Sequence, residues 1–395
     1  MQISGKIILS KGRDEAVKRF HPWVFSGAIH HVDGTPEDGD IVEVYDIAGN
    51  YLATGHACTG SIAVKVFHFG PHKPDGNFLK NKLLQCLQLR RDIGFTNNAQ
   101  SNAYRLVFSE GDGLPGLIID FYNGVAVIQA HSTGMYLMRN ALSDALKEIY
   151  GPELKAVYDK SAEALGKSGG LSQGDGFLFK SSESVEILEN GHKFLIDFVQ
   201  GQKTGYFLDQ RDNRALLGSY AKGKKVLNAF CYTGGFSVYA LAAGAKMVVS
   251  LDSSRKAMDT LEENLRMNGF DKSRHESVVA DAKVYLSTMP DDFDLIVLDP
   301  PAFAKRHADR HKALQGYRYI NAAALSKIKA GGLLFTFSCS QAMDREMFVS
   351  MVMSAALEAK RNVRILHHMG HSADHPVSVF HPEGEYLKGL VLSIG

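Results

Sequence analysis

A cysteine and an aspartate that each follow an apolar run are the residues best suited to covalent chemistry. Cys339 lies between two serines directly after the run Leu333 to Phe337, and Asp299 follows the run DLIVL and precedes two prolines. A thiolate is a strong nucleophile, and a carboxylate can stabilise charge on the group under attack. Because a lone cysteine is more often a small buried apolar residue, the prediction requires a fold that brings Cys339 and Asp299 together.

A glycine-containing turn after an earlier apolar run is typical of a cofactor site. The run KVLNAF leads into Cys-Tyr-Thr-Gly-Gly, where glycine lets backbone N–H groups approach a ligand and the following helix N-terminus favours an anionic group. By itself this turn is weak evidence, since it lacks the G-x-G-x-x-G pattern and a purely structural turn would look the same. We predict cofactor contacts by Asn228, Phe230, Tyr232, Thr233 and Gly234.

The next two apolar runs each end in an aspartate. Asp252 can accept hydrogen bonds from two ribose hydroxyls, and Asp281 can accept one from an adenine amino group. Either aspartate would serve equally well as the N-cap of a helix. The predicted nucleoside site therefore includes Asp252, Ser253, Asp281 and Ala282, together with Asp299.

The fourth run ends in Asp299-Pro-Pro-Ala-Phe303, which favours S-adenosylmethionine over a nicotinamide cofactor. Two prolines stop the chain from continuing into a helix and fix a rigid turn. An aspartate, two prolines and an aromatic residue at this position form the pocket for the substrate base in many class I methyltransferases. We therefore expect Pro300, Pro301 and Phe303 to line a base pocket, although a simple strand exit marked by prolines is the plain alternative.

A cysteine beside such a pocket suggests methylation of cytosine at C5. This carbon is a poor nucleophile until a thiolate has added to C6, which makes C5 react as an enamine carbon. Cys339 would be the nucleophile, and Asp299 would bind the N3 and amino edge of the base and stabilise the charge that develops there. Cys58, Cys86 and Cys231 are expected to be structural, or in the case of Cys231 to line the cofactor turn.

These residues require strands whose carboxyl ends meet at one edge. From Val226 onward, apolar strands alternate with segments long enough for helices, which indicates an open, mostly parallel α/β sheet. Ligands bind at the carboxyl ends of the strands in such sheets. The chain begins with short apolar runs separated by Gly, Asp and Pro, which predict a β-rich domain. A predicted helix at 78–93 follows, and then a pattern of strand, strand, helix at 135–150 and strand, which indicates an α+β domain. We predict domains at 1–72, 73–185 and 186–395.

Bulk composition fits a soluble cytoplasmic protein. The 395 residues are 45% hydrophobic and 22% charged, with a formal net charge of +1 that neither requires nor excludes a polyanionic partner. Four widely spaced cysteines indicate a reducing compartment, and no run has the length of a membrane span. We expect no metal, because the histidines near the C-terminus lack partners at ligand spacing: His367, His368, His371, His375 and His381.

The whole chain resembles the bacterial large-subunit ribosomal RNA methyltransferases that form 5-methylcytosine. The resemblance is carried by blocks such as His21-Pro-Trp-Val-Phe-Ser-Gly27, Ser109-Glu-Gly-Asp-Gly-Leu-Pro-Gly116, Lys203-Thr-Gly-Tyr-Phe-Leu-Asp-Gln-Arg211, Phe337-Ser-Cys-Ser340 and Ala373-Asp-His-Pro376. It implies an RNA-binding PUA domain, a small α+β domain and a Rossmann-like class I methyltransferase domain. It also implies that Cys339 is the nucleophile, that 203–211 packs over S-adenosylmethionine with contacts from Gln210 and Arg211, and that 23S ribosomal RNA or a large-subunit precursor is the substrate.

Three other functions fit parts of the sequence. Methylation of a guanine or other base nitrogen would use much of the same catalytic domain and no thiolate. A non-catalytic RNA-binding or ribosome-assembly factor would keep the fold, although Asp252, Asp281, Asp299 and Cys339 argue against it. A dinucleotide-dependent dehydrogenase is disfavoured because the glycine-containing turn lacks the G-x-G-x-x-G pattern and because the fourth run ends in Asp299-Pro-Pro. A homodimer is compatible with all of these functions. Basic residues after the double proline fit an RNA partner or an exposed helix start: Lys305, Arg306, Arg310, Lys312 and Arg318.

Overall fold

The computed structural model describes residues 2–166, 174–303 and 309–395. The chain divides into two compact units. One contains residues up to Leu188 together with Ile196–Leu208 and Ala373–Gly384, and the other contains Glu189–Leu195, Asp209–Ser372 and Glu385–Gly395. Each unit therefore includes segments that are far apart in the sequence.

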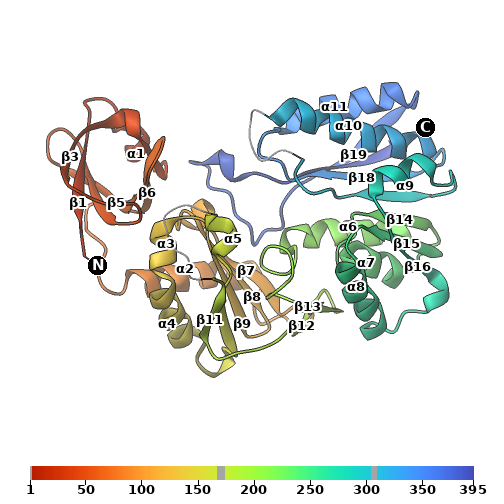
Figure 1. Cartoon of the computed structure of the whole chain (residues 1–395), viewed down its shortest axis with the longest axis horizontal. Coiled ribbons are helices and arrows are strands. Elements are labelled where there is room, and N and C mark those ends of the chain that lie inside the picture. The colour runs from red at the N-terminus through yellow and green to blue at the C-terminus, as the bar shows by residue number, and fades with distance from the viewer. Residues whose placement is uncertain (1, 167–173, 304–308) are drawn as a thin grey trace. The chain divides into compact units, whose positions relative to one another are not determined.

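The first unit begins with a six-stranded β-domain, drawn in red and orange in Figure 1. Its sheet has the order β2-β6-β5-β4-β1-β3, in which β1 and β4 run parallel and the other neighbours antiparallel. β-Branched residues favour these extended strands, and Val42, Val44, Val64 and Val66 are fully buried in its core. The elements are β1 (Gly5–Leu9), α1 (Glu15–Lys18), β2 (Trp23–Phe25), β3 (Ile29–Gly34), β4 (Ile41–Tyr45), β5 (Tyr51–Ala57) and β6 (Ile62–Phe69).

A five-stranded sheet of order β11-β10-β9-β8-β7 forms the second part of this unit. The predicted helix at 135–150 is instead two helices that meet at Met138, one turn after Gly134, a residue type that supports helix poorly. The elements are α2 (Phe78–Asp92), β7 (Ala103–Phe108), β8 (Leu117–Tyr122), β9 (Val125–Ala130), α3 (Thr133–Leu137), α4 (Arg139–Tyr150), β10 (Ala156–Asp159), α5 (Ala162–Leu165) and β11 (Gly176–Phe179). A hairpin of β12 (Val185–Glu189) and β13 (His192–Ile196) follows.

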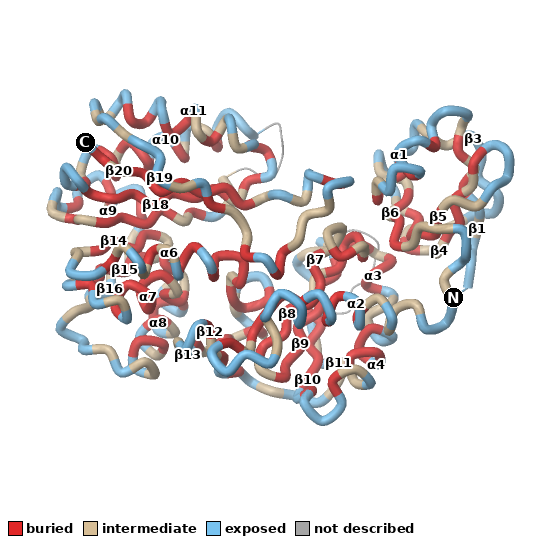
Figure 2. The backbone as a smooth tube through the Cα atoms, turned by 180° about the vertical axis from the view of Figure 1, so that it is seen from behind, coloured by how far each residue is buried: buried red, intermediate tan, exposed pale blue. Residues whose placement is uncertain are grey.

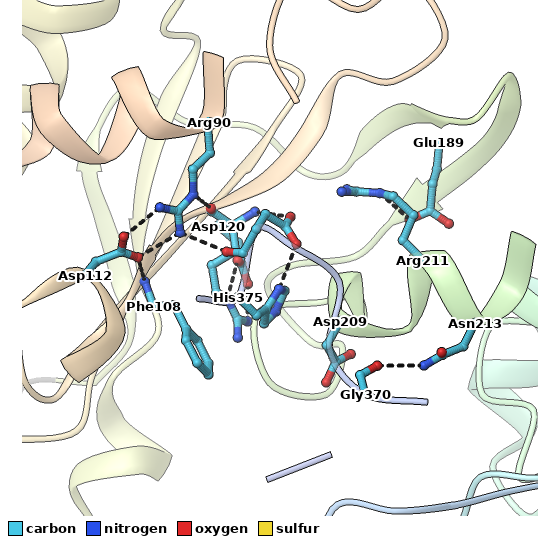
Figure 3. Close-up of polar contacts among 12 residues, drawn as sticks. Arg90, Phe108, Asp112, Asp120, Glu189, Asp209, Arg211, Asn213, Gly370 and His375 are labelled. Atoms are coloured by element: carbon cyan, nitrogen blue, oxygen red, sulfur yellow. Dashed lines mark hydrogen bonds and ion pairs between the residues drawn. The ribbon is translucent and has the colours of Figure 1, made fainter. Parts of the chain in front are cut away.

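A fully buried arginine ties the C-terminal segment 373–384 into the first unit. Arg90 of α2 forms two hydrogen bonds to the Asp112 carboxylate, at 2.6 and 2.7 Å, and donates to the Arg105 and Asp374 carbonyls (Figure 3). The Asp374 carboxylate in turn accepts the Arg105 backbone N–H at 2.9 Å. A guanidinium has five donors in a fixed fork, which suits it to join several acceptors at one point.

The second unit is a three-layer α/β domain around a seven-stranded sheet, as the sequence predicted. The strand order is β16-β15-β14-β17-β18-β20-β19, with β20 antiparallel to both neighbours and the other pairs parallel. Helices α10 and α11 lie on one side of the sheet and α6, α7 and α8 on the other (Figure 1). The inner strands are buried almost throughout (Figure 2), which explains their continuous apolar runs.

The order of these elements places a topological switch between β14 and β17, since the chain moves outward from β14 in both directions. Ligands of open α/β sheets bind at such a switch, outside the carboxyl ends of the strands. The elements are α6 (Arg211–Ala221), β14 (Lys225–Ala229), α7 (Gly235–Ala242), β15 (Met247–Asp252), α8 (Arg255–Met267), β16 (His275–Val279), α9 (Ala282–Thr288), β17 (Leu295–Leu298), α10 (Arg310–Lys327), β18 (Leu333–Ser338), α11 (Arg345–Glu358), β19 (Val363–Met369) and β20 (Lys388–Ile394).

Candidate active site

The predicted nucleophile and the double-proline turn meet at the carboxyl edge of the sheet. β17 and β18 are parallel neighbours with Leu298 opposite Thr336, so the residues after each strand emerge at the same edge. The Cys339 Sγ lies 4.0 Å from the Pro300 carbonyl oxygen, and the side chain is partly buried. The structure thus brings together the thiol and the Asp299 turn that the sequence analysis paired.

Electrostatic interactions couple Cys339 to Asp299. The pKa of Asp299 is raised to about 7, chiefly by burial and next by the neighbouring Asp209 carboxylate, while a hydrogen bond from Gln210 acts in the opposite direction. The pKa of Cys339 is likewise raised to about 12, chiefly by burial and in smaller part by the Asp299 and Asp209 carboxylates. A carboxyl group with this pKa is partly protonated at neutral pH, and it can then donate a hydrogen bond.

A chain of amides positions the Asp299 carboxyl group. Gln210 Nε2 donates to Asp299 Oδ2 at 2.9 Å, and Asn213 Nδ2 donates to Gln210 Oε1 at 2.6 Å. Asn213 Nδ2 also donates to the Gly370 carbonyl at 3.0 Å (Figure 3). Gln210, which was predicted to contact the cofactor, therefore holds Asp299 through its amide.

Asp209 is a site residue that the sequence analysis did not single out. Its Oδ2 accepts a hydrogen bond from the Tyr386 hydroxyl, whereas its Oδ1 is buried and has no hydrogen-bond partner among the described residues. Asp209 raises the pKa of both Asp299 and Cys339. A signal was present in the sequence, since Asp209 lies in the block Lys203 to Arg211 next to Gln210.

Lys388 is the second site residue that the sequence analysis missed. It begins β20 opposite Ser338 of β18, is 3% exposed, and donates to the Ser340 carbonyl at 2.7 Å. A lone lysine at the start of the apolar run GLVLSI was the available signal, because a charged residue is seldom placed in a buried strand without a reason.

The turn between β14 and α7 has the backbone shape expected of a ligand-binding loop. Phe230 and Tyr232 adopt left-handed backbone conformations, with φ values of 59° and 48°. Gly234, the N-cap of α7, has a φ of 84°, and a Cβ atom there would lie 2.6 Å from Leu261 Cγ. Thr233 is buried, and its carbonyl accepts a hydrogen bond from Asn264 at 2.9 Å, which holds the turn against α8.

The two predicted nucleoside aspartates lie at neighbouring strand ends and also support the backbone. Asp252 accepts the backbone N–H groups of Tyr232 and Ser254, both at 2.9 Å, so it joins the β14 turn to the start of α8. Asp281 caps α9 by accepting the N–H groups of Lys283 and Val284. The N-cap alternative is therefore present at Asp281, and Ala282, the first residue of α9, is buried. Ser253 is exposed.

Two predicted cofactor residues have side chains occupied in internal contacts. Asn228 is fully buried and donates to the Ser237 hydroxyl at 2.8 Å, although its Oδ1 has no partner in the described chain. Arg211 is buried and forms an ion pair with Glu189 at 3.4 Å. Both arrangements stabilise the elements around the site, and direct contacts with the cofactor stay predictions.

The predicted base pocket is partly described. Pro300 is buried and Pro301 exposed, and the Phe303 ring packs on Tyr317 of α10 with centroids 4.6 Å apart. Among the predicted basic residues, Arg310 and Lys312 are exposed and Arg318 lies 3.6 Å from Glu358. Lys305 and Arg306 lie outside the described residues.

The described residues contain no group of three or more His, Cys, Asp or Glu side chains arranged to hold a metal ion. His367 instead contacts the Tyr220 hydroxyl at 2.8 Å, and His371 accepts the backbone N–H groups of Tyr386 and Leu387. In the same part of the chain, no helix has the length and apolar character of a membrane span.

Comparison with known proteins gives strong matches along the whole chain. A family model described as an S-adenosylmethionine-dependent methyltransferase matches residues 175–372, and one described as a PUA-like domain matches residues 7–69. Curated proteins named Ribosomal RNA large subunit methyltransferase I are similar over nearly their full length. The one from Aeromonas hydrophila is 43% identical over 99% of both chains, and one from Vibrio cholerae is 40% identical over 98% of this chain and 99% of its own.

Solved structures share the fold. A putative SAM-dependent methyltransferase from Streptococcus mutans superposes with a TM-score of 0.83 at 23% identity, covering 99% of this chain and all of its own. A putative methyltransferase complexed with SAH gives the same TM-score, identity and coverage.

Proposed function

Because the chain belongs to the family of large-subunit ribosomal RNA methyltransferase I proteins, which use S-adenosylmethionine, we propose that it methylates C5 of a cytosine in 23S ribosomal RNA through a covalent Cys339 adduct. The observation that carries the proposal is the pairing of Cys339 with the Asp299-Pro300-Pro301 turn, Sγ to Pro300 carbonyl at 4.0 Å. A methyltransferase acting on a guanine nitrogen would have no use for a thiol at this position.

The cofactor site of this proposal fits the residues at the carboxyl edge of the sheet. The left-handed turn of Phe230 and Tyr232, the carboxylates of Asp252 and Asp281, and the Asp299 group would hold S-adenosylmethionine. S-adenosylmethionine supplies an electrophilic methyl group when it is bound. Among the described residues, Oδ1 of Asp209 and Oδ1 of Asn228 are buried without a hydrogen-bond partner, so both are acceptors that a ligand donor could satisfy.

In the proposed reaction the chain activates the base in two ways. The Cys339 thiolate adds to C6, and the electrons of the C5–C6 double bond move toward N3 and C5. Asp299 in its protonated form donates to N3 and neutralises that charge, which its pKa of about 7 allows at neutral pH. C5 takes the methyl group, and N3 returns its proton to Asp299. C5 then loses its proton to a base, the C5–H electrons re-form the C5–C6 double bond, and the C6–S bond breaks to return the thiolate. Phe303 stacks on the base beside Pro300 and Pro301.

An RNA in which the target cytosine carries fluorine at C5 tests the mechanism. Fluorine blocks the loss of the C5 substituent, so the Cys339–C6 adduct should accumulate as a covalent protein–RNA species that survives denaturation. Cys339→Ala should form no adduct and should lose at least ~10³-fold in methylation rate while binding S-adenosylmethionine normally. Cys58→Ala, a change in the β-domain, is the matched control and should behave as the native protein.

Analysis of the modified nucleoside separates the alternatives. Methylation of large-subunit RNA with 5-methylcytidine as product supports the proposal. Activity in Cys339→Ala, or a methylated guanosine as the product, would replace it with base-nitrogen methylation. Binding of RNA with no S-adenosylmethionine binding would indicate a non-catalytic factor.

A further inference from the structure

A cation from β20, Lys388, is bonded to the segment that carries Cys339 and has no role in the proposed reaction. Lys388 pairs with Ser338 across the antiparallel β18–β20 ladder, and its Nζ donates to the Ser340 carbonyl at 2.7 Å. The Lys388 ammonium therefore bonds to the residue after Cys339, and the Lys388 backbone pairs with the residue before Cys339. This holds the lysine side chain against the segment that carries the thiol.

Lys388 is costly to bury, and its neighbours do not offset that cost. The residue is 3% exposed, and no described carboxylate forms an ion pair with it. Burial lowers the pKa of Lys388 to about 8, and Cys339 is the largest opposing influence. Because a buried charge without a full partner destabilises a fold, such a residue is often kept for function. The other charged groups that act on Lys388 are Glu385, Arg345 and Asp344.

Cys339, conversely, lies in surroundings that oppose the thiolate. Burial raises its pKa to about 12, Asp299 and Asp209 both act in the same direction, and Lys388 acts against them. Tyr317 of α10 also faces this group, since Cys339 raises the pKa of its buried hydroxyl. A nucleophilic thiolate at neutral pH thus needs a compensating positive charge.

We propose that Lys388 is the positioning residue for the Cys339 thiolate, its ammonium providing the charge against which the sulfur loses its proton; this rests on the proposed function. The S–H bond breaks, the proton passes to solvent, and the ammonium keeps its own protons beside the sulfur. When the thiolate later leaves C6, the same ammonium stabilises it again. Lys388 contacts neither RNA nor S-adenosylmethionine in this role.

Alkylation of the thiol measures this role without RNA or cofactor. The full chain is treated with iodoacetamide from pH 6 to pH 10, and modification at Cys339 is followed by peptide mass spectrometry. Lys388→Gln keeps a donor for the Ser340 carbonyl and removes the charge, so alkylation of Cys339 should be roughly tenfold slower at a fixed pH below 8, where the native lysine is still charged. Lys388→Arg keeps the charge and should follow the native profile. Lys329→Met, which removes a surface ion pair to Asp294, is the control.

An unchanged alkylation profile in Lys388→Gln would overturn the proposal. If that variant does not fold, as judged by circular dichroism and S-adenosylmethionine binding, the lysine is titrated by NMR in the native protein and in Cys339→Ser. The proposal requires Lys388 to titrate at a lower pH in Cys339→Ser, because thiolate and ammonium stabilise each other reciprocally, and equal titration would refute it. The two proposals can fail separately. If alkylation depends on Lys388 but the protein forms no adduct with the fluorinated RNA, the role of Lys388 stands and the C5 mechanism is rejected.

Discussion

At the scale of single residues, Asp299 shows how one carboxyl group can be prepared for proton donation. Its side chain lies beside Asp209, and two like charges close together cannot both be ionised without cost. Gln210 donates to one of its oxygens and leaves the other available to a ligand. Asp299 is thus placed by its neighbours both in orientation and in protonation state.

The raised pKa of Asp299 predicts that stability falls as the pH rises. The folded protein binds a proton at Asp299 that the unfolded chain has already lost, so from about pH 4 to about pH 7 the native state becomes progressively less favourable. Relative to Asp299→Asn, the native protein should lose on the order of 1–3 kcal/mol of unfolding free energy between pH 4.5 and pH 8, measured by urea denaturation.

Asp271→Asn is the control for this pH dependence, because Asp271 should change the unfolding free energy with pH in the opposite direction. Backbone hydrogen bonding from Ser273 lowers the pKa of Asp271, so its contribution is present above the unfolded pKa and is lost as the pH falls. If the unfolding free energies of the native protein and Asp299→Asn differ by the same amount at both pH values, the pKa of Asp299 is not raised in the folded protein.

Residue chemistry was predictable from the sequence only where the residue follows a recognisable strand. Cys339 and Asp299 each come directly after an apolar run, and parallel strands must bring such positions to one edge. Asp209 and Lys388 reach the site from segments that are far from these two strands in sequence. Neither the hydrophobic pattern nor the spacing of residues predicts that these segments pack beside Cys339 and Asp299. The side-chain direction of Asn228, which turns under α7, likewise depends on packing.

At the scale of elements, the β14–α7 turn depends on the lack of a side chain at Gly234. The residue has a φ of 84° and lies against Leu261 of α8, with the turn held further by Asp252 and Asn264. The strands of this domain lie where the apolar runs predicted them, because parallel strands buried on both faces consist of continuous apolar residues. The break at Met138 was not predicted, since apolar spacing continues through it.

Gly234→Ala should weaken S-adenosylmethionine binding by about tenfold or more, equivalent to about 1.4 kcal/mol. The new Cβ would lie 2.6 Å from Leu261 Cγ, so the turn must move away from α8. Gly223→Ala is the matched control, because Gly223 also has a positive φ, 72°, but no atom lies within 4 Å of its Cβ position. Both variants carry the strain of a left-handed alanine, about 1–2 kcal/mol, and titration calorimetry should separate them by affinity. Equal affinities would show that the turn tolerates the displacement.

At the scale of the whole molecule, the chain does not complete one unit before starting the other. Residues 373–384 belong to the first unit, although they follow β19 and precede β20 of the second. Arg90 connects them to α2 and to the Asp112 turn (Figure 3). No periodicity or motif predicts this exchange of segments, because it depends on contacts between residues nearly three hundred positions apart.

Arg90→Met should destabilise the first unit by about 3–5 kcal/mol, because it leaves the buried Asp112 carboxylate without its cation. Backbone amides of 373–384 should exchange hydrogen faster, since the bond from Arg90 to the Asp374 carbonyl is lost. Arg91→Met, at an exposed neighbouring position, should leave both measurements unchanged. Unaltered exchange in the Arg90 variant would show that other contacts hold this segment.

The place of β20 in the sheet also constrains how the protein is made. Residues 388–394 form a strand between β18 and β19, yet they are translated after both. Until residues 388–394 have left the ribosome, β18 and β19 lack the strand that pairs with both, and Lys388 has not reached the Cys339 segment. The thiol segment is therefore completed only after residues 388–394 have been translated, so a chain that stops before them cannot carry a complete reaction centre.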